Sequence, residues 1–495
     1  MSAVPEATLR RAAAVATLAA VVLPWLNPFA PGPSSAAMPW LFSAACAAVL
    51  LLSGPWVDWP RLARLGWLVA ALISVGIALV QYLGWSEPFY PWVNLTHLGE
   101  AYGNLRQRNQ FATLTSMGLA VVLFAAPTRG PWAALALAGA AWLGLGDAAS
   151  SSRTGLAQLV LLLGLVVVWR HHRSPATLAR LLLALTAYAA GAWLLPHLAG
   201  LDPGSSGILN RLQDRELACT SRLTLWANVL HLISLRPWLG WGWGELGYAH
   251  FITLYPGDRF CDILDNAHNL PLHLAVELGV PLAATICALL LALVWRARPW
   301  RESDATRQVS WAVLAVIALH SLLEYPLWYG PFQIAAVVAV LHLARFGRSE
   351  SDRAQPSVWP AWIAIVLLAC VAYATWDYHR VSQIYLNAEE RDAAYRDDTL
   401  AKSAQSTLFG GHARFAELTL SDVHRANASH IYALAEDLLH FSAEARVAEA
   451  LIDAALLLGR DSDAAFYLLR FKAAFPQEYA RWRGAGTLPH KGTEP

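Results

Sequence analysis

The chain has 495 residues, of which 56% are hydrophobic and 14% are charged. Soluble domains carry about 25% charged residues, so this composition excludes an ordinary soluble protein and predicts an integral membrane protein with several spans. The net charge of +1 gives no reason to expect a nucleic-acid partner.

Apolar segments long enough to cross a bilayer recur up to residue 376. A spanning helix needs about 20 mostly apolar residues, and about eleven segments approach that length. We therefore predict an all-α, polytopic membrane protein with spans at 12–28, 37–53, 65–84, 111–127, 132–147, 154–169, 179–196, 272–295, 308–323, 330–345 and 358–376. The first segment resembles a signal peptide, but Pro-Gly-Pro at 31–33 makes a poor cleavage region, so we interpret the segment as an anchor.

Arginine clusters fall in alternate loops between these segments, beginning with Arg10, Arg61, Arg129 and Arg170. Positive charge marks the cytoplasmic side of a membrane protein. The pattern therefore predicts a cytoplasmic N-terminus and, after an odd number of spans, a C-terminus on the outer side. The outer segments are then 29–36, 85–110, 148–153, 197–271, 324–329 and 377–495.

Two of these outer loops, 85–110 and 197–271, break the charge pattern most. Arg106 and Arg108 lie in the first, and the long loop contains Arg211, Arg215, Arg222, Arg236 and Arg259. A genome rich in G and C would favour arginine codons everywhere. Guanidinium groups also bind oxyanions with two parallel hydrogen bonds, so the outer arginines predict an anion site.

From residue 377 the composition becomes that of a soluble helical domain. Apolar residues recur at helical spacing, with alanine at close-packed positions, which is typical of helical hairpins of the tetratricopeptide type. We predict a transmembrane domain at 1–376 that includes the outer loop 197–271, a helical outer domain at 377–483, and a disordered tail at 484–495.

The first polar motif, at residues 103–112, lies at the outer end of the fourth span. It contains Gln107, Asn109 and Gln110 beside the two arginines of that loop. Amide side chains at this depth can bind a lipid head group. The alternative is an interfacial loop with a helix-capping asparagine and arginines that extend toward water.

The second motif is Ser150-Ser-Ser-Arg153-Thr-Gly155, just before the sixth span. The serines can cap the helix, which would place Arg153 beside the backbone N–H groups of a helix N-terminus. Such a position favours an anion. The alternative is an interfacial arginine that contacts lipid phosphate.

The third motif, Ser221-Arg222, opens an amphipathic helix that ends near Ile233, and Gly240-Trp-Gly-Trp-Gly244 follows it. Glycine permits close approach of a ligand, and tryptophan offers flat faces to sugar rings. A surface salt bridge of Arg222 with Asp214 or Glu216 is the alternative.

The fourth motif, Asp265-Asn-Ala-His268-Asn269, ends the long loop, and Glu277 follows in the next span. A histidine can act as a base near neutral pH, although a lone histidine is more often structural. A carboxylate within a span must be paired, so we expect Glu277 to tie helices together or to orient the base.

The fifth motif, His320-Ser-Leu-Leu-Glu324-Tyr325-Pro-Leu-Trp-Tyr329, lies where the ninth span leaves the bilayer. Tyr325 and Tyr329 can bind a head group or belong to the aromatic belt of the membrane interface. We expect a structural role for Glu324.

Two of the five cysteines, Cys219 and Cys261, lie in the long outer loop, where a disulfide is allowed outside the cytoplasm. The sequence does not give the distance between them, so the pairing stays open. The histidines, cysteines and carboxylates show no metal-ligand spacing, and we predict neither a metal nor a cofactor.

Taken in order, these five motifs resemble those of the O-antigen ligase/polymerase superfamily, and most of all the PglL-type bacterial protein O-oligosaccharyltransferases. Gln107-Arg-Asn109 resembles the Gln-x-Asn element of that family, although Arg108 stands where proline is common. The Ser-Arg, arginine-helix, glycine-turn and histidine segments follow, and His320 to Tyr329 is similar to the signature of the PglL-like branch. The resemblance covers about residues 90 to 480.

The resemblance implies a GT-C-like enzyme of the bacterial inner membrane that transfers a glycan with inversion and without a metal. The donor would be an undecaprenyl-diphosphate-linked glycan, and the acceptor a serine or threonine hydroxyl of a periplasmic protein such as a pilin. Arg222, Arg153 and His268 would be catalytic, with His268 acting as a base or as a phosphate ligand. The substrate-binding residues would be Gln107, Asn109, Gln110, Arg215, Asn269, Tyr325 and Tyr329.

Three alternatives remain open. An O-antigen ligase would use a lipid A-core sugar as its acceptor, and a polymerase would use a growing glycan. A lipid-linked glycan transporter would use the arginines to move a head group, but such proteins contain internal repeats and broken helices, and we detect neither.

Overall fold

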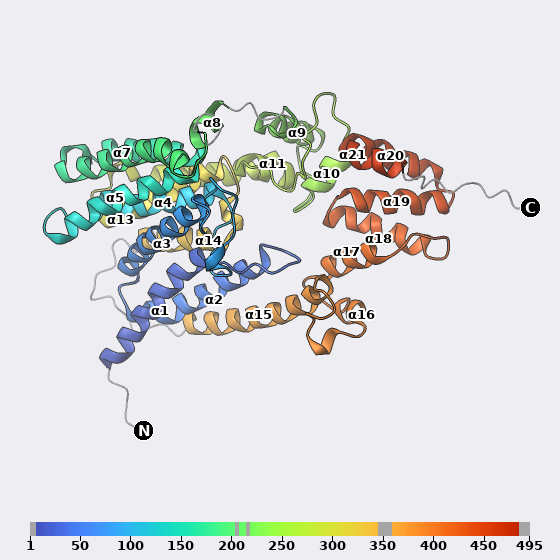
Figure 1. The fold of residues 1–495 in the computed structure, drawn as a ribbon, viewed down its shortest axis with the longest axis horizontal. Coiled ribbons are helices and arrows are strands. Elements are labelled where there is room, and N and C mark those ends of the chain that lie inside the picture. Colours follow the sequence, from blue (N-terminus) through green and yellow to red (C-terminus); the bar gives the residue numbers. More distant parts are fainter. Residues whose placement is uncertain (1–5, 203–206, 214–217, 345–358, 485–495) are drawn as a thin grey trace, which may run out of the picture. The chain divides into compact units, whose positions relative to one another are not determined.

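The computed structural model describes residues 6–202, 207–213, 218–344 and 359–484. In these ranges the chain is helical and contains no strand (Figure 1). Residues 485–495 of the predicted tail lie outside the described part. The chain divides into two compact units. The first comprises Met1–Asp214 with Leu293–Thr375, and the second comprises Arg215–Ala292 with Trp376–Pro495.

The first unit contains the helices that carry most of the predicted spans. They are α1 (Glu6–Leu26), α2 (Ala37–Ser53), α3 (Trp59–Tyr82), α4 (Arg108–Phe124), α5 (Pro131–Ser150), α6 (Arg153–Val168), α7 (Pro175–Leu198), the short α8 (Gly207–Gln213), α13 (Ala305–Ser321), α14 (Gly330–Ala344) and most of α15 (Trp359–Ser382). Helix α12 (Val280–Ala297) passes from the second unit into the first.

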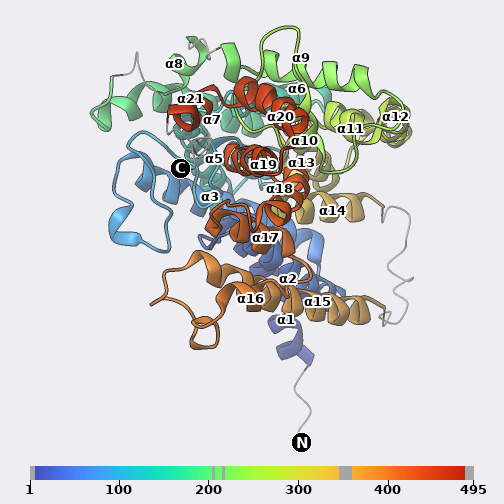
Figure 2. The same ribbon diagram turned by 90° about the vertical axis from the view of Figure 1, so that its right-hand side faces the viewer.

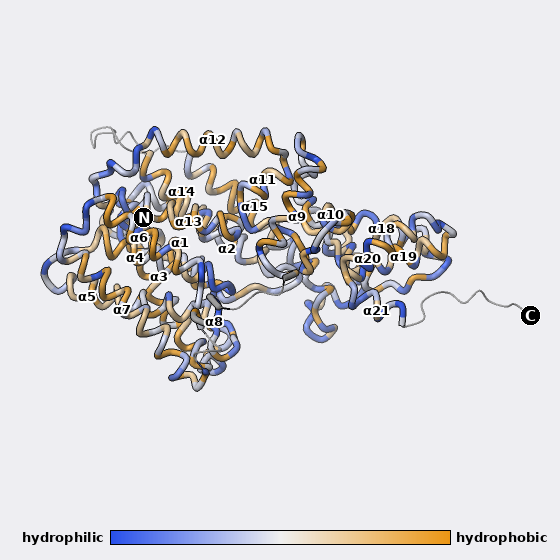
Figure 3. The backbone as a smooth tube through the Cα atoms, turned by 90° about the horizontal axis from the view of Figure 1, so that it is seen from above, coloured by the Kyte–Doolittle hydropathy of each residue, from blue (hydrophilic) through white to orange (hydrophobic). Residues whose placement is uncertain are grey.

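Ten of the eleven predicted spans coincide with one helix each, and the span at 272–295 coincides with two. Among the described residues, seven helices are long and apolar enough to cross a membrane: α1, α2, α3, α5, α7, α12 and α15, the α2, α12 and α15 spans including the short turns that follow them. Figure 3 shows the apolar stretch along α12. Helices α4, α6, α13 and α14 have 15 to 17 residues. The chain is therefore a polytopic, all-helical membrane protein, and the count of about eleven spans stays a prediction.

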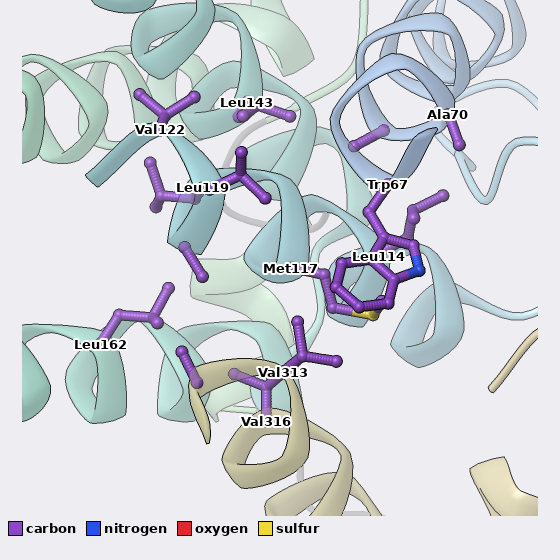
Figure 4. Close-up of a cluster of buried hydrophobic side chains, with 14 of the residues drawn as sticks. Trp67, Ala70, Leu114, Met117, Leu119, Val122, Leu143, Leu162, Val313 and Val316 are labelled. Atoms are coloured by element: carbon purple, nitrogen blue, oxygen red, sulfur yellow. The ribbon is translucent and has the colours of Figure 1, made fainter. Parts of the chain in front are cut away.

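Helix α4 forms the centre of the first unit. All its residues from Gln110 to Phe124 are buried, and α3, α5, α6 and α13 pack around it. Figure 4 shows Leu114, Met117 and Leu119 of this helix among side chains of its neighbours. Helices α5 and α7 approach so closely that a Cβ at Gly144 would lie 2.2 Å from the carbonyl oxygen of Ala184. Small residues at such contacts are typical of membrane helices.

The predicted single span at 272–295 is divided into α11 (Leu270–Leu278) and α12. The break is at Gly279, whose φ is +86°, a value that favours glycine. A Cβ at this position would lie 2.2 Å from the carbonyl oxygen of Trp238, so the close approach of the glycine-rich turn also requires glycine. The structure corrects the prediction here, because a contact with a distant segment ends the helix.

The second unit combines the long loop with the C-terminal region (Figure 2). Its loop part contains α9 (Arg222–Leu235), α10 (Leu246–Ile252) and α11. Its C-terminal part contains α16 (Thr399–Ser403), α17 (Gly410–Leu420), α18 (Ala428–Phe441), α19 (Ala445–Leu457), α20 (Asp461–Ala474) and α21 (Pro476–Gly484). Consecutive helices from α16 to α21 pack against each other, as helical hairpins do.

Helix α10 packs directly on the C-terminal helices. Tyr248 stacks on His440 with ring centroids 3.9 Å apart, and Nδ1 of His440 is 2.7 Å from Oε2 of Glu245. Phe251 is buried in the core of α18, α19 and α20, and Arg470 donates a hydrogen bond of 2.7 Å to the carbonyl oxygen of Ile252. The compact units thus differ from the predicted domains, which assigned this loop to the transmembrane part.

Candidate functional site

Four polar side chains of the first unit form a hydrogen-bonded network at the N-terminal ends of α4 and α6. Ser152 Oγ accepts the Gly155 N–H at 3.0 Å and donates to Asn109 Oδ1 at 2.7 Å. Asn109 Nδ2 donates to Glu324 Oε1 at 3.0 Å, and Gln107 Nε2 lies 3.4 Å from Glu324 Oε2. The carboxylate therefore lies near helix N-termini, where negative charge is favoured.

A second layer of polar contacts holds the same helices together. Nδ1 of His320, which is fully buried on α13, lies 2.9 Å from Thr113 Oγ1 of α4. Gln158 of α6 donates to the same oxygen at 2.8 Å and to the carbonyl oxygen of Val316 at 3.1 Å. Glu324 is placed by this layer, because its N–H donates to the His320 carbonyl at 2.8 Å. Glu324 therefore connects the N-terminal end of α4 to the C-terminal end of α13.

The predicted residues of the first unit have different environments. Ser152 caps α6, so Arg153 occupies the first position of this helix and is half-buried. Tyr325 and Tyr329 are also half-buried and stack with ring centroids 5.8 Å apart. Gln110 is only 1% exposed, so its side chain lies inside the helix bundle and not at the surface of the network.

The two arginines of the segment 85–110 have intramolecular partners. Arg106 donates to the carbonyl oxygen of Pro28, and Arg108 forms an ion pair with Glu100. Arg211 of the long loop donates to the Ser151 carbonyl at 3.2 Å. These guanidinium groups stabilise loops, so the break in the charge rule at 85–110 has a structural explanation.

In the second unit, α9 packs against the segment that carries His268. Ser221 caps this helix by accepting the Thr224 N–H at 3.2 Å, which makes Arg222 its first residue. Trp226 lies four residues further on and donates its indole N–H to the Ala267 carbonyl at 3.1 Å. Residues four apart share a helix face, so Arg222 is on the face that meets the His268 segment.

His268 and Asn269 lie at the turn into α11. His268 has a φ of +49°, and its N–H donates to Asn266 Oδ1 at 2.9 Å. The side chain of Asn269 caps α11 by accepting the Leu272 N–H at 3.1 Å. Arg215, predicted to contact substrate, lies outside the described residues.

The glycine-rich turn is paired with the end of α11. The N–H groups of Trp241 and Gly242 donate to the carbonyl oxygens of Val276 and Glu277 at 2.9 and 3.0 Å. The Gly244 N–H donates to Glu277 Oε1 at 3.0 Å. Burial raises the pKa of Glu277 to about 7, although the Gly244 hydrogen bond opposes this rise. Glu277 thus ties the turn to α11.

Two other arginines of the long loop support its structure. Arg259 donates to the carbonyl oxygens of Thr253 and His250 at 3.0 and 2.8 Å, and burial lowers its pKa to about 10. Arg236 lies over the ring of Trp241 at 4.1 Å. Both guanidinium groups thus hold parts of the loop in place.

A disulfide between Cys219 and Cys261 joins the start of α9 to the loop that leads to His268. The two Cα atoms are 5.3 Å apart, and the Cys261 N–H donates to the Cys219 carbonyl at 3.1 Å. Asn228 holds the same loop, because it donates to the Asp258 carbonyl and accepts the Phe260 N–H, both at 2.8 Å. Asn228 was not among the predicted residues, although a polar side chain on the apolar face of an amphipathic helix signals such a contact.

The predicted site residues belong to both compact units. Gln107, Asn109 and Arg153 are in the first, whereas Arg222 and His268 are in the second. The described ranges contain no group of three or more histidine, cysteine or acidic side chains that could hold a metal ion.

Three family models match the chain. Residues 138–287 match the model described as O-antigen ligase, and residues 308–487 match that of the C-terminal part of a virulence factor membrane-bound polymerase. Residues 101–124 match a protein glycosylation ligase model. The first of these ranges contains Arg153, Arg222 and His268, and the last contains Gln107 and Asn109.

Characterised relatives carry related names. The chain is 24% identical over 327 residues to a general O-oligosaccharyltransferase of Acinetobacter baylyi, covering 63% of this chain and 56% of the relative. It is 30% identical over 337 residues to an O-antigen ligase of Pseudomonas aeruginosa, covering 68% and 69%. A ComP-specific O-oligosaccharyltransferase of Acinetobacter baylyi is 28% identical over 121 residues, covering 24% and 22%. The chain thus spans little more than half the length of the first of these relatives.

Proposed function

Because this chain belongs to the O-antigen ligase family, we propose that it is an inverting oligosaccharyltransferase of the inner membrane. Its donor is a glycan linked to undecaprenyl diphosphate, and its acceptor is a serine or threonine hydroxyl of a periplasmic, pilin-like protein. The N-terminus lies in the cytoplasm and the helical C-terminal region in the periplasm, where it meets the acceptor. The reaction needs no metal and no cofactor.

The names of the relatives support a protein acceptor. Two of them are O-oligosaccharyltransferases, one specific for ComP, and the protein glycosylation ligase match covers Gln107 and Asn109. The relative that is 30% identical is an O-antigen ligase, which favours a second candidate function in which the acceptor is a lipid A-core sugar. The match at 308–487 favours glycan polymerisation in the same way.

The proposed chemistry is a single displacement. The acceptor hydroxyl attacks the anomeric carbon of the glycan as the bond to the diphosphate oxygen breaks, which inverts that carbon. Negative charge builds on the departing diphosphate, and Arg222 stabilises it by about 3 kcal/mol in a site from which water is excluded. The hydroxyl proton passes to His268 when this residue acts as the base.

One observation carries the proposal: Arg222 and His268 lie on segments that are fixed to each other. The Trp226–Ala267 hydrogen bond and the Cys219–Cys261 disulfide join α9 and the residues before it to the loop that leads to His268. The segments that carry the Arg222 guanidinium group and the His268 ring are thereby fixed to each other. An enzyme that binds phosphate next to a proton-transfer group requires such a fixed arrangement.

The experiment compares Arg222→Ala and His268→Ala with the wild-type protein in cells that make a lipid-linked glycan. Arg414→Ala, at an exposed ion pair on α17, is the matched control. We expect both site variants to be expressed and to lose transfer by about 10²-fold or more, and the control to retain it. Wild-type transfer by both site variants would refute the assignment.

The acceptor decides between the candidate functions. The same cells are analysed for glycan on a pilin-like protein, on lipid A-core and in longer polymers, and the first result supports our proposal. Transfer should survive EDTA, because arginines provide the positive charge. The pH profile separates the two roles of His268. Activity that falls on acidification identifies a base, and activity that falls in alkali identifies a cationic phosphate ligand.

A further inference from the structure

His273 is a buried histidine between the glycine-rich turn and His268. It lies on α11 one turn before Glu277 and is 2% exposed. Its Nε2 is 3.5 Å from Glu277 Oε2, and its Nδ1 is 3.5 Å from the Ala267 nitrogen, whose N–H points to it. The Ala267 contact is a long hydrogen bond, and the Glu277 contact is a close approach of the two polar atoms without hydrogen-bond geometry. The ring thus joins a carboxylate to the backbone that precedes His268.

The peptide between Ala267 and His268 is held at both of its polar groups, and the preceding N–H, that of Ala267, is held as well. The Ala267 N–H faces His273 Nδ1, the Ala267 carbonyl accepts the Trp226 indole N–H at 3.1 Å, and the His268 N–H donates to Asn266 Oδ1 at 2.9 Å. The φ of +49° at His268 costs a residue with a side chain about 1–2 kcal/mol. These contacts hold the conformation that directs the His268 side chain.

We propose that His273 is a positioning residue whose Nδ1 holds the Ala267 N–H and whose Nε2–H faces Glu277, so that it fixes the backbone from which His268 projects. The proposal rests on the proposed function, in which His268 contacts the substrate. A chain of contacts then runs from the Gly244 N–H through Glu277 and His273 to Ala267. This chain couples the geometry of the glycine-rich turn to His268.

The tautomer follows from the hydrogen bonds. A ring nitrogen that accepts from a backbone N–H is unprotonated, so the proton of neutral His273 is on Nε2, toward Glu277. Burial, followed by repulsion from His268, lowers the pKa of His273 to about 4, which keeps the ring neutral over the physiological range. The charged or titratable neighbours of the pair are Glu245 and His268, and the ring of Trp243 meets that of His273 edge-on at 6.2 Å.

Two polar substitutions separate the two nitrogens. In His273→Asn, the side-chain oxygen takes the place of Nδ1 and keeps an acceptor for Ala267. In His273→Gln, the amide nitrogen takes the place of Nε2 and keeps a donor toward Glu277. His273→Leu removes both contacts at similar volume. The control is His430→Asn, at an exposed histidine of α18 paired with Glu417.

The first measurement is hydrogen–deuterium exchange of the full-length protein in detergent, followed on peptides that contain Ala267. We expect faster exchange in His273→Leu and His273→Gln, and exchange close to wild type in His273→Asn. Equal exchange in the Asn and Gln variants overturns the proposal, whether or not the protein is active.

The second measurement is steady-state transfer from a lipid-linked glycan. We expect kcat to fall about 10²-fold in the Leu and Gln variants and less than tenfold in His273→Asn, with donor KM within about twofold of wild type. Activity in His273→Gln that equals or exceeds that in His273→Asn overturns the proposal. A wild-type protein that transfers no glycan but shows the expected exchange pattern refutes the proposed function and leaves the positioning of the backbone intact.

Discussion

Replacement of Gly240 by alanine tests whether the glycine-rich turn must lie against α11. The φ of Gly240 is +70°, and a Cβ there would lie 2.3 Å from the carbonyl oxygen of Glu277 and 2.7 Å from the Gly279 nitrogen. These neighbours are backbone atoms, and the pairing of the Trp241 N–H with the Val276 carbonyl keeps them in place. The added methyl group therefore strains both the backbone angle and the contact.

The expected loss of stability is the sum of these two effects. A left-handed conformation costs a residue with a Cβ about 1–2 kcal/mol, and an overpacked contact costs about 1–3 kcal/mol, so we expect Gly240→Ala to destabilise by about 2–5 kcal/mol. Gly244 isolates the first effect, because its φ is +81° and a Cβ there has no neighbour within 4 Å. A Cβ at Gly257 also has open space, and its φ lies outside the left-handed range, so Gly257→Ala should have almost no effect.

The assay is thermal unfolding of the three purified variants in one detergent, followed by tryptophan fluorescence. A loss of 1 kcal/mol shifts Tm by about 2–4 °C for a unit of 150–250 residues. We expect the largest decrease in Tm for Gly240→Ala, a smaller one for Gly244→Ala, and almost none for Gly257→Ala. Equal Tm values for Gly240→Ala and Gly257→Ala would refute the packing that we describe.

Three further predictions follow from buried groups and crosslinks. Burial raises the pKa of Glu277 from 4.5 to about 7, so the fold is most stable below pH 4.5, where the carboxyl group is protonated, and loses this stability as the pH rises to 7. Between pH 4.5 and 7, the wild-type protein should lose about 3 kcal/mol of stability relative to Glu277→Gln. Parallel curves of stability against pH for the two proteins would contradict the raised pKa. Gly155→Ala should destabilise, because its Cβ would lie 2.4 Å from a carboxylate oxygen of α5. Gly164→Ala on the same helix meets open space and should stabilise by about 0.5–1 kcal/mol, because alanine favours a helix interior over glycine; equal melting temperatures of the two variants would exclude this packing. The Cys219–Cys261 bond closes a separation of 42 residues, so the double serine variant should lose about 3–4 kcal/mol, and a reductant should lower Tm in wild type alone.

The positions of the helices were largely predictable from the sequence, because spans are defined by local apolar runs. The break at Gly279 has a local signal in Gly279-Val-Pro281, whereas the approach of the Trp238 carbonyl, which also requires glycine there, comes from another segment. The two compact units also differ from the domains predicted from the sequence. The packing of Phe251 on the C-terminal helices depends on contacts between segments that are far apart in the chain.

The candidate site was predictable where it depends on local geometry. Ser152 and Ser221 cap helices as the motifs predict, and Arg153 and Arg222 follow directly. The Asn109–Ser152–Glu324 hydrogen bonds were not predictable, because their partners come from different helices. The same holds for His273, since only the structure shows that its two nitrogens face different segments.

The packing of α10 on the C-terminal helices has a consequence for hybrid enzymes. If the C-terminal region of a relative replaced residues 376–495 alone, Phe251 would lose its hydrophobic surroundings, and Glu245 and Tyr248 would lose His440. The boundaries of an exchange between relatives should therefore enclose both 215–292 and the chain from 376 onward. A graft made in this way transplants an intact core together with its own loop, so that any change in acceptor choice reports on recognition and not on misfolding.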